Sequence, residues 1–484
     1  MIFNSLTYLL FLALVVTSYW LMPHKFRIGL IFVSSCTFYG FWRPEFLLLM
    51  FISASIDYLA ALKMIDAQNT ITRKRWLYLS LSINLGLLFY FKYLFFIVDN
   101  ATLALNYLGY NFHAPAINII LPLAISFYTF ETISYIVDVY HKQIEPEKNF
   151  WKYSCFVIFF PKLIAGPVLR ASEILPQFNQ VLDFRNSLFI SGLHRIIVGL
   201  FLKVVIADNL APIVDAGFSQ PINSLSALDV WTLAFLFGFQ IYFDFSAYSS
   251  IAIGSARLFG IHIPENFNFP YASSSPKEFW QRWHISLSSW IRDYLYLPLQ
   301  GERVRTHSSG GISITGDHHK KSTLIFLFIT WAIMGLWHGA NWTFLIWGLY
   351  HASIIAVYRL INIRHISYPQ KFKRYLGWLI TLPLMMLGWI PFRAQSVEDT
   401  LMLWLKIFNP DNYLWLGMKE NTYIIAALSL IAFLLSYALH TIKKDFFVKH
   451  LAWTFTLATA SYTLGIYLII IFLRPINQFI YFQF

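Results

Sequence analysis

The sequence predicts an all-α protein that crosses a membrane many times. Hydrophobic residues make up 57% of its 484 residues and charged residues only 12%, which is far more apolar than an ordinary soluble domain. Apolar runs long enough to cross a bilayer recur along the chain, and the 19% aromatic share suits the interface belts of membrane proteins. We therefore expect a single integral membrane domain over residues 1–484, with no soluble domain.

Each expected spanning helix is an apolar run bounded by charged or turn-forming residues. The pattern predicts about 11–12 such helices. The runs lie at about residues 5–22, 28–42, 46–63, 76–98, 116–138, 187–206, 229–248, 323–340, 342–359, 376–392, 422–440 and 452–472.

Basic residues fall in alternate loops between these runs, as the positive-inside rule requires of cytoplasmic loops. Such loops hold Lys25 and Arg27, residues 63–75, residues 142–152, residues 359–374 and residues 443–449. We therefore expect an N-terminus outside the inner (plasma) membrane, and an even number of crossings places the tail, residues 474–484, outside too. Topology explains the formal charge of +12 better than nucleic-acid binding does.

Two regions depart from a simple series of hairpins. In residues 150–186, prolines and a glycine interrupt apolar segments too short to span, which predicts re-entrant or half-length helices that line a pathway. Residues 254–321 form a long basic connection expected on the cytoplasmic side. Within it, apolar residues at three-to-four spacing predict one amphipathic helix at the membrane interface, followed by a polar loop over residues 301–321. The spaced apolar residues are Trp280, Trp283, Leu287, Ile291 and Tyr294.

His338 is the first candidate catalytic residue. It lies in the stretch Gly335–Trp342, inside a run that begins near Leu324. An ionisable group at that depth normally faces a bundle interior or a wet cavity and has a function. A neutral imidazole there can accept a proton from an attacking hydroxyl. The alternative is a structural histidine whose hydrogen bonds are satisfied within the core.

His284 is the second candidate, in the stretch Phe279–Tyr294. Arg282, Arg292 and Asp293 flank it, and guanidinium groups match phosphate oxygens, so this stretch can hold a phosphorylated donor. Anchoring of arginine and tryptophan at lipid headgroups is an equally good explanation. Another charge, Asp244, is expected to pair structurally with an arginine.

Several other chemistries find no support in the sequence. It contains no glycine-rich phosphate loop, no GxSxG elbow and no HExxH motif, so a serine hydrolase is not indicated. Two cysteines, Cys36 and Cys155, do not make a disulfide framework. The adjacent His318 and His319 point to different faces of a helix and have no further ligand cluster nearby, so we expect no metal site.

The motifs resemble the bacterial branch of the membrane-bound O-acyltransferase family, in particular its alginate and peptidoglycan O-acetylation members. This resemblance implies spanning and re-entrant helices around a central funnel. It places the family's two histidines on His338, as the catalytic residue, and on His284, near the cytoplasmic mouth. The stretches that carry it are Pro161–Pro167, Tyr242–Tyr248, Pro264–Asn268, Phe279–Tyr296, Gly335–Trp342 and the tail Phe479–Phe484.

The resemblance also implies a donor and a partner. The acyl group is expected to be acetyl from cytoplasmic acetyl-CoA, passed through the protein to an extracytoplasmic transferase of the SGNH type that modifies a polysaccharide. Tyr481, placed outside by the topology, can carry the acyl group as an ester, although an aromatic interface anchor explains it equally well. The candidate donor- and substrate-binding residues are Arg282, Trp283, Asp293, Trp337 and Asn341.

Two other functions remain open at this point. A transporter or flippase of an acyl or lipid-linked species would also use broken helices and a buried histidine, although we find no inverted repeat. A scaffold for an extracytoplasmic transferase is the third. The chain departs from the family after Pro298, where Leu299–Arg303 and a longer loop replace the usual Leu-Gly-Gly turn, so donor contacts in that loop cannot be carried over.

Overall fold

The computed structural model describes residues 1–113, 119–306, 312–316, 323–361, 370–441 and 451–473, and most of these are helical. The first half contains α1 (Leu6–Leu21), α2 (His24–Gly40), α3 (Glu45–Asp66), α4 (Thr70–Leu88), the π-helix η1 (Phe89–Tyr93), α5 (Leu94–Tyr107), α6 (Ile125–Tyr140), α7 (Phe150–Ile158), α8 (Phe160–Leu163), α9 (Ala171–Phe178), α10 (Asn186–Leu200), the π-helix η2 (Phe201–Ala207), α11 (Asp208–Phe218), the 3₁₀ turn η3 (Ile222–Ser224) and α12 (Ala227–Leu258).

The second half begins with the 3₁₀ turn η4 (Pro270–Ala272) and contains the one described pair of strands. It comprises α13 (Pro276–Arg282), α14 (Ile285–Ile291), the π-helix η5 (Arg292–Tyr296), α15 (Leu297–Leu299), strands β1 (Glu302–Thr306) and β2 (Ile312–Gly316), α16 (Thr323–His338), α17 (Trp342–Leu360), α18 (Gln370–Leu387), α19 (Trp389–Arg393), α20 (Val397–Phe408), the 3₁₀ turn η7 (Pro410–Tyr413), α21 (Glu420–Thr441) and α23 (Leu451–Phe472).

Seven described helical segments are long and apolar enough to cross a membrane, and three shorter apolar helices accompany them. The all-α membrane class is therefore confirmed. The number of long segments is lower than the number of apolar runs because some runs form helices too short to qualify. The predicted run at residues 116–138, for example, yields α6, which begins only at Ile125.

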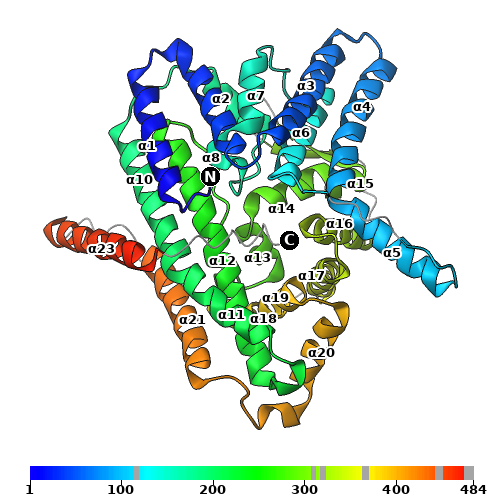
Figure 1. Cartoon of the computed structure of the whole chain (residues 1–484), viewed down its shortest axis with the longest axis vertical. Coiled ribbons are helices and arrows are strands. Elements are labelled where there is room, and N and C mark those ends of the chain that lie inside the picture. The colour runs from blue at the N-terminus through cyan, green and yellow to red at the C-terminus, as the bar shows by residue number, and fades with distance from the viewer. Residues whose placement is uncertain (114–118, 307–311, 317–322, 362–369, 442–450, 474–484) are drawn as a thin grey trace.

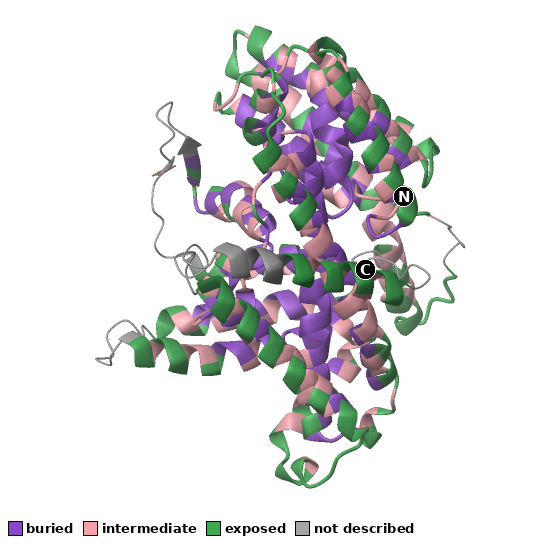
Figure 2. Cartoon of the chain, turned by 90° about the vertical axis from the view of Figure 1, so that its left-hand side faces the viewer, coloured by how far each residue is buried: buried purple, intermediate pink, exposed green. Residues whose placement is uncertain are grey.

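The longest helix, α12, lies at the centre of the protein, and most of its residues are buried (Figures 1 and 2). With 32 residues it is about 48 Å long, more than a bilayer core requires. A capping box starts it: the Asp229 amide donates to Ser226 Oγ at 3.1 Å, and the Ser226 amide donates to Asp229 Oδ2 at 2.7 Å. Helix α10 packs closely along it, because a Cβ at Gly192 would lie only 2.8 Å from the carbonyl oxygen of Gly254.

Buried charges in this region are paired. Asp244 of α12 contacts Lys203 of η2 at 2.9 Å, and Lys203 also contacts Asp208 at 2.7 Å. The prediction that Asp244 forms a structural ion pair is confirmed, but its partner is a lysine, not an arginine. Elsewhere in the core, Glu131 of α6 pairs with Lys162 of α8.

Residues 150–186 are broken into the short helices α7, α8 and α9, the longest of nine residues. Gly166 and Pro167 lie in the break between α8 and α9, as the sequence indicates, whereas Pro161 lies within α8 and Pro176 within α9. None is long enough to span alone. All of α8 is buried, as is α7 from Tyr153 onward. Their depth in a membrane stays a prediction.

The predicted single amphipathic helix over residues 280–294 is wrong. Two short helices, α13 and α14, replace it, because His284 between them adopts left-handed backbone angles (φ 41°, ψ 56°) that end one helix and start the next. Trp283 and Leu287 are buried in protein. The predicted polar loop is wrong as well for residues 302–306 and 312–316, which pair as an antiparallel hairpin from Glu302–Gly316 to Thr306–Ile312.

Candidate active site

His338 is the last residue of α16 and lies in an aromatic cage. Its imidazole is 5% exposed and lies 4.8 Å from the ring of Trp347, 4.9 Å from Trp337 and 5.3 Å from Phe392, measured between ring centroids. Helices α16 and α17 approach closely enough to build this cage because Gly335 and Gly348 face each other. A Cβ at Gly335 would lie 2.2 Å from the carbonyl oxygen of Phe344.

A cavity of about 530 Å³ opens on the side of His338, and we call it the N-terminal cavity. The first residues of the chain and the segment before α6 form its walls. Two titratable side chains line it, those of His338 and of Lys92 in η1. The remaining lining residues are Met1, Ile2, Ser5, Thr7, Phe41, Trp42, Leu121, Pro122, Leu123, Ala124, Ile125, Ser126, Phe127, Ile164 and Trp337.

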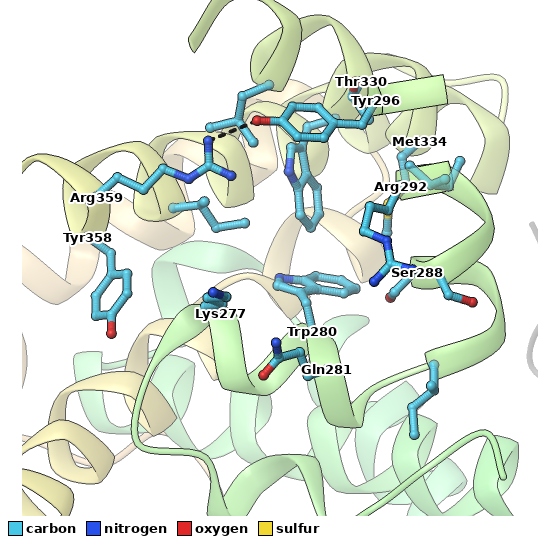
Figure 3. Close-up of a pocket in the computed structure, with 16 residues that line it drawn as sticks. Lys277, Trp280, Gln281, Ser288, Arg292, Tyr296, Thr330, Met334, Tyr358 and Arg359 are labelled. Carbon is cyan, nitrogen blue, oxygen red and sulfur yellow. Dashed lines mark hydrogen bonds between the residues drawn. The ribbon is translucent and has the colours of Figure 1, made fainter. Parts of the chain in front are cut away.

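A second cavity of about 560 Å³, which we call the basic pocket, lies along the other end of α16 (Figure 3). It combines three cations with an apolar wall. Arg359 Nη1 donates to the Tyr296 hydroxyl at 3.1 Å, which holds that guanidinium at the rim. The cations are Lys277, Arg292 and Arg359, and the apolar wall includes Trp280, Leu327, Trp331, Met334 and Ile355.

Helix α16 connects the two cavities. Met334 lines the basic pocket and His338 lines the N-terminal cavity. Four residues of an α-helix advance by about 6 Å, so about one helical turn separates the two linings. We call this turn of α16, residues 334–338, the partition. Three aromatic rings stack beside it: the ring centroids of Trp290 and Phe130 are 3.9 Å apart, and those of Phe130 and Trp337 are 5.1 Å apart. His338, in the lining of the N-terminal cavity, therefore lies about one helical turn along α16 from the lining of the basic pocket.

His284 is fully buried and lines neither large cavity, although the next residue, Ile285, lines the basic pocket, so its expected place near the cytoplasmic mouth stays a prediction. Its Nδ1 lies 3.1 Å from Asn266 Oδ1. The backbone N–H of Ser286 also points to that Asn266 atom, at 3.2 Å, which identifies it as the carbonyl oxygen. Because an oxygen acceptor requires a donor, neutral His284 carries its proton on Nδ1, and Nε2 keeps a lone pair. Nε2 has no hydrogen-bond partner among the described residues.

Another imidazole and an ammonium lie close to His338. The ring of Trp347 lies between His338 and His351, with ring centroids 4.8 and 4.9 Å away. Lys92 donates to the carbonyl oxygen of His338 at 3.1 Å. His351, on α17, packs against Trp280 and Trp331 with ring centroids 5.0 and 5.6 Å away, and it lines neither cavity.

Arg282 and Asp293, predicted to bind the donor, are held in ion pairs. Arg282 contacts Glu278 at 2.7 Å, and although burial alone raises the pKa of Glu278, hydrogen bonds from Ser274 and the charge of Arg282 lower it overall. Arg282 does not line the basic pocket, where Lys277, Arg292 and Arg359 stand instead. Asp293 pairs with Arg170 and with Arg292, the latter at 2.6 Å.

The other predicted residues divide into packing, capping and undescribed positions. Trp283 stacks on Phe279 with ring centroids 5.8 Å apart and lines neither cavity. Asn341 caps α17 by accepting from the Thr343 amide at 3.0 Å. Trp337 does line the N-terminal cavity. Tyr481 lies outside the described residues, so its role stays a prediction.

Sequence reasoning missed Lys92 and Asn266. Lys92 lies inside the apolar run at residues 76–98, and the rule that drew attention to His338, an ionisable group within a span, applies equally to it. Asn266 gave no such signal, because an asparagine in a connecting segment is common. Its role becomes visible only when its contacts to His284 and Ser286 are known.

A family model matches the part of the chain that contains both histidines. Residues 147–393, which include α12, both histidines and the basic pocket's cations, match the model of MBOAT, the membrane-bound O-acyltransferase family. The matched region therefore holds most of the partition, whereas Lys92 and the first residues that line the N-terminal cavity precede it.

Similar proteins extend the likeness over almost the whole chain. A probable alginate O-acetylase of Azotobacter vinelandii is 38% identical, covering 90% of this chain and 83% of the relative. A peptidoglycan O-acetyltransferase of Helicobacter pylori is 37% identical over 76% of this chain and 71% of its own length. A teichoic acid D-alanyltransferase of Bacillus subtilis is 27% identical over 55% of this chain and 64% of its own. The chain belongs to the membrane-bound O-acyltransferase family and is a multi-pass membrane O-acetyltransferase.

Proposed function

We propose that the protein takes an acetyl group from cytoplasmic acetyl-CoA, passes it across the inner membrane, and delivers it to an extracytoplasmic partner transferase for O-acetylation of a polysaccharide. The observation that carries the proposal is the pair of cavities whose linings on α16 lie about one helical turn apart, with His338 in the lining of the N-terminal cavity. The names of the relatives suggest alginate or peptidoglycan as the polysaccharide.

The orientation follows from the basic loops. Arg359, at the end of α17, begins a basic segment that the positive-inside rule assigns to the cytoplasm, so the basic pocket would open there. The N-terminal cavity contains Met1 and would open on the outside. A reporter fused after Phe484 should read outside, and a cytoplasmic signal would contradict this orientation.

The basic pocket suits a thioester donor that carries phosphates. Lys277, Arg292 and Arg359 offer charge-assisted hydrogen bonds to phosphate oxygens at the rim. The indole of Trp280 and the side chain of Met334 belong to the apolar wall of the same pocket (Figure 3). This combination of a charged rim and an apolar channel matches a phosphorylated head with a long, weakly polar arm that ends in the thioester.

The chemistry at the partition is acyl transfer. A hydroxyl oxygen in the N-terminal cavity attacks the thioester carbonyl carbon and forms a C–O bond, while His338 takes the hydroxyl proton. The C–S bond then breaks, and the proton passes from the imidazole to the departing thiolate. Holding both reactants at one partition removes much of the entropic cost of bringing them together.

The first acceptor we propose is the Tyr481 hydroxyl of the aromatic tail, which would hold the acetyl group as an ester until a partner of the SGNH type removes it. Replacement of Tyr481 by Phe should abolish label transfer to the partner. Hydrolysis of acetyl-CoA by water at the partition should continue in this variant.

The direct test uses purified full-length protein, radiolabelled acetyl-CoA, and measurement of free CoA and protein-bound label. His338→Asn should abolish both. His351→Asn is the matched control, because His351 is an equally buried histidine in the same aromatic cluster that lines neither cavity. Equal activity of wild type and His338→Asn would contradict the proposal, and movement of intact acetyl-CoA without CoA release would favour a transporter.

A further inference from the structure

Lys92 is a partly buried cation at the wall of the N-terminal cavity, and its two partners lie 245 and 246 residues away in the sequence. Its ammonium donates to the carbonyl oxygen of Trp337 and, at 3.1 Å, to that of His338. It also lies 5.7 Å from the centroid of the Trp337 ring. The lysine therefore touches the backbone of the residue that we place at the centre of the reaction.

The charge of Lys92 is only partly compensated. None of the carboxylates in the described part of the chain forms an ion pair with it. Its two carbonyl partners belong to the C-terminal end of α16, whose dipole supplies about half a negative charge. An ammonium has three N–H donors, and among the described residues only these two carbonyls accept from it. One donor and a net positive charge thus remain at the cavity wall.

We propose that Lys92 is a catalytic residue that stabilises the oxyanion formed during acyl transfer. When the acceptor oxygen bonds to the thioester carbon, the carbonyl π electrons move to the carbonyl oxygen, which becomes negatively charged. The third N–H of Lys92 donates to that oxygen while His338 holds the proton of the acceptor. On collapse the electrons return, the C–S bond breaks, and the thiolate receives the proton.

The position of Lys92 is well suited to this step. The ammonium is fixed by two hydrogen bonds before the reaction starts, so little reorganisation is needed when charge develops. Phe127 and Trp337 line the same cavity with apolar surface, and a less polar surrounding strengthens the interaction between the ammonium and a developing oxyanion. The inference rests on the proposed acyl transfer, and it assigns to Lys92 a role that the proposed function does not include.

Lys92 also has a structural role, because its two hydrogen bonds satisfy carbonyls at the end of α16 that no helical N–H can reach. Tyr93 shares this capping role, since its hydroxyl donates to the carbonyl oxygen of Leu336 at 3.1 Å, but it carries no charge and does not line the cavity. Tyr93→Phe therefore removes a cap of the same helix end and keeps the cation, which separates the two roles.

The test compares Lys92→Met, Lys92→Arg, Tyr93→Phe and His338→Asn in the full-length protein, with acetyl-CoA as the probe. Lys92→Met should lower kcat for CoA release about 100- to 1000-fold, the usual effect of losing one oxyanion donor, while the KM for acetyl-CoA stays near the wild-type value. Lys92→Arg, which retains charge and donors, should restore kcat to within about tenfold of wild type. Tyr93→Phe should remain close to wild type.

The outcomes distinguish this inference from the function on which it rests. If His338→Asn is inactive while Lys92→Met turns over like wild type, Lys92 has no catalytic role and the acyl-transfer proposal stands. If His338→Asn is active, the acyl-transfer proposal itself fails. An equal loss of activity in Lys92→Met and Tyr93→Phe, with equal falls in melting temperature, would show that capping of α16 accounts for the effect and would overturn the inference.

Discussion

Replacing Gly335 with alanine should separate α16 from α17 and impair acyl transfer. The added Cβ would lie 2.2 Å from the carbonyl oxygen of Phe344, and ordinary contact begins at 3.4 Å, so one helix must move by about 1.2 Å. The obstacle is backbone, which cannot rotate away as a side chain can. Overpacking of this kind costs about 1–3 kcal/mol of stability. A misplacement of about 1 Å at a reacting centre can lower turnover about 100-fold.

The assay measures thermal unfolding and CoA release for the same purified sample. Gly86→Ala is the matched control, because Gly86 also lies within a helix but a Cβ there meets nothing within 4 Å. Alanine at that position should stabilise the helix by up to about 1 kcal/mol and leave turnover unchanged. A Gly335→Ala protein with the melting temperature and turnover of wild type would refute the claim that close helix contact positions His338.

Three further predictions concern the surroundings of the partition. Asn266→Leu removes the acceptor that fixes the proton of His284 on Nδ1, so ¹⁵N NMR of labelled histidine should show a mixture of tautomers for His284. A single unchanged tautomer would contradict the assignment. Lys277→Gln should raise the KM for acetyl-CoA about tenfold with kcat unchanged, as expected when one charge-assisted phosphate contact is lost; an unchanged KM would exclude Lys277 from donor binding. Glu131→Gln leaves the charge of Lys162 uncompensated in the core and should lower the free energy of unfolding, measured with denaturant, by about 3–5 kcal/mol. A decrease below about 1 kcal/mol would mean that the ion pair does not stabilise the protein.

Much of the fold was predictable because it depends on local properties of the chain. Long apolar runs form helices in a membrane whatever their partners are, and proline and glycine break them in residues 150–186. Periodicity failed at His284, because a residue in the left-handed region leaves no trace in the spacing of apolar residues. The hairpin of β1 and β2 was missed because its strands are short and polar residues outnumber apolar ones.

The candidate active site was predictable only in part. His338 was recognisable because burying an ionisable group in a span is costly unless it has a function. Of the cations of the basic pocket, Arg292 was among the residues expected to hold a phosphorylated donor, but Lys277 and Arg359 were not, since they come from other segments and join it only in the folded protein. Arg282 was chosen for its closeness to His284 in sequence, yet a one-turn ion pair with Glu278 occupies it.

The central claim is that an acetyl group crosses the membrane at the partition marked by His338. The most direct measurement seals radiolabelled acetyl-CoA inside vesicles that contain the protein in one orientation, with the basic pocket facing the lumen. Radiolabel should then appear outside, as acetate or as an ester that external protease removes, while CoA stays inside, and His338→Asn should abolish this. Label that remains wholly inside, or that appears outside equally with His338→Asn, would contradict the account.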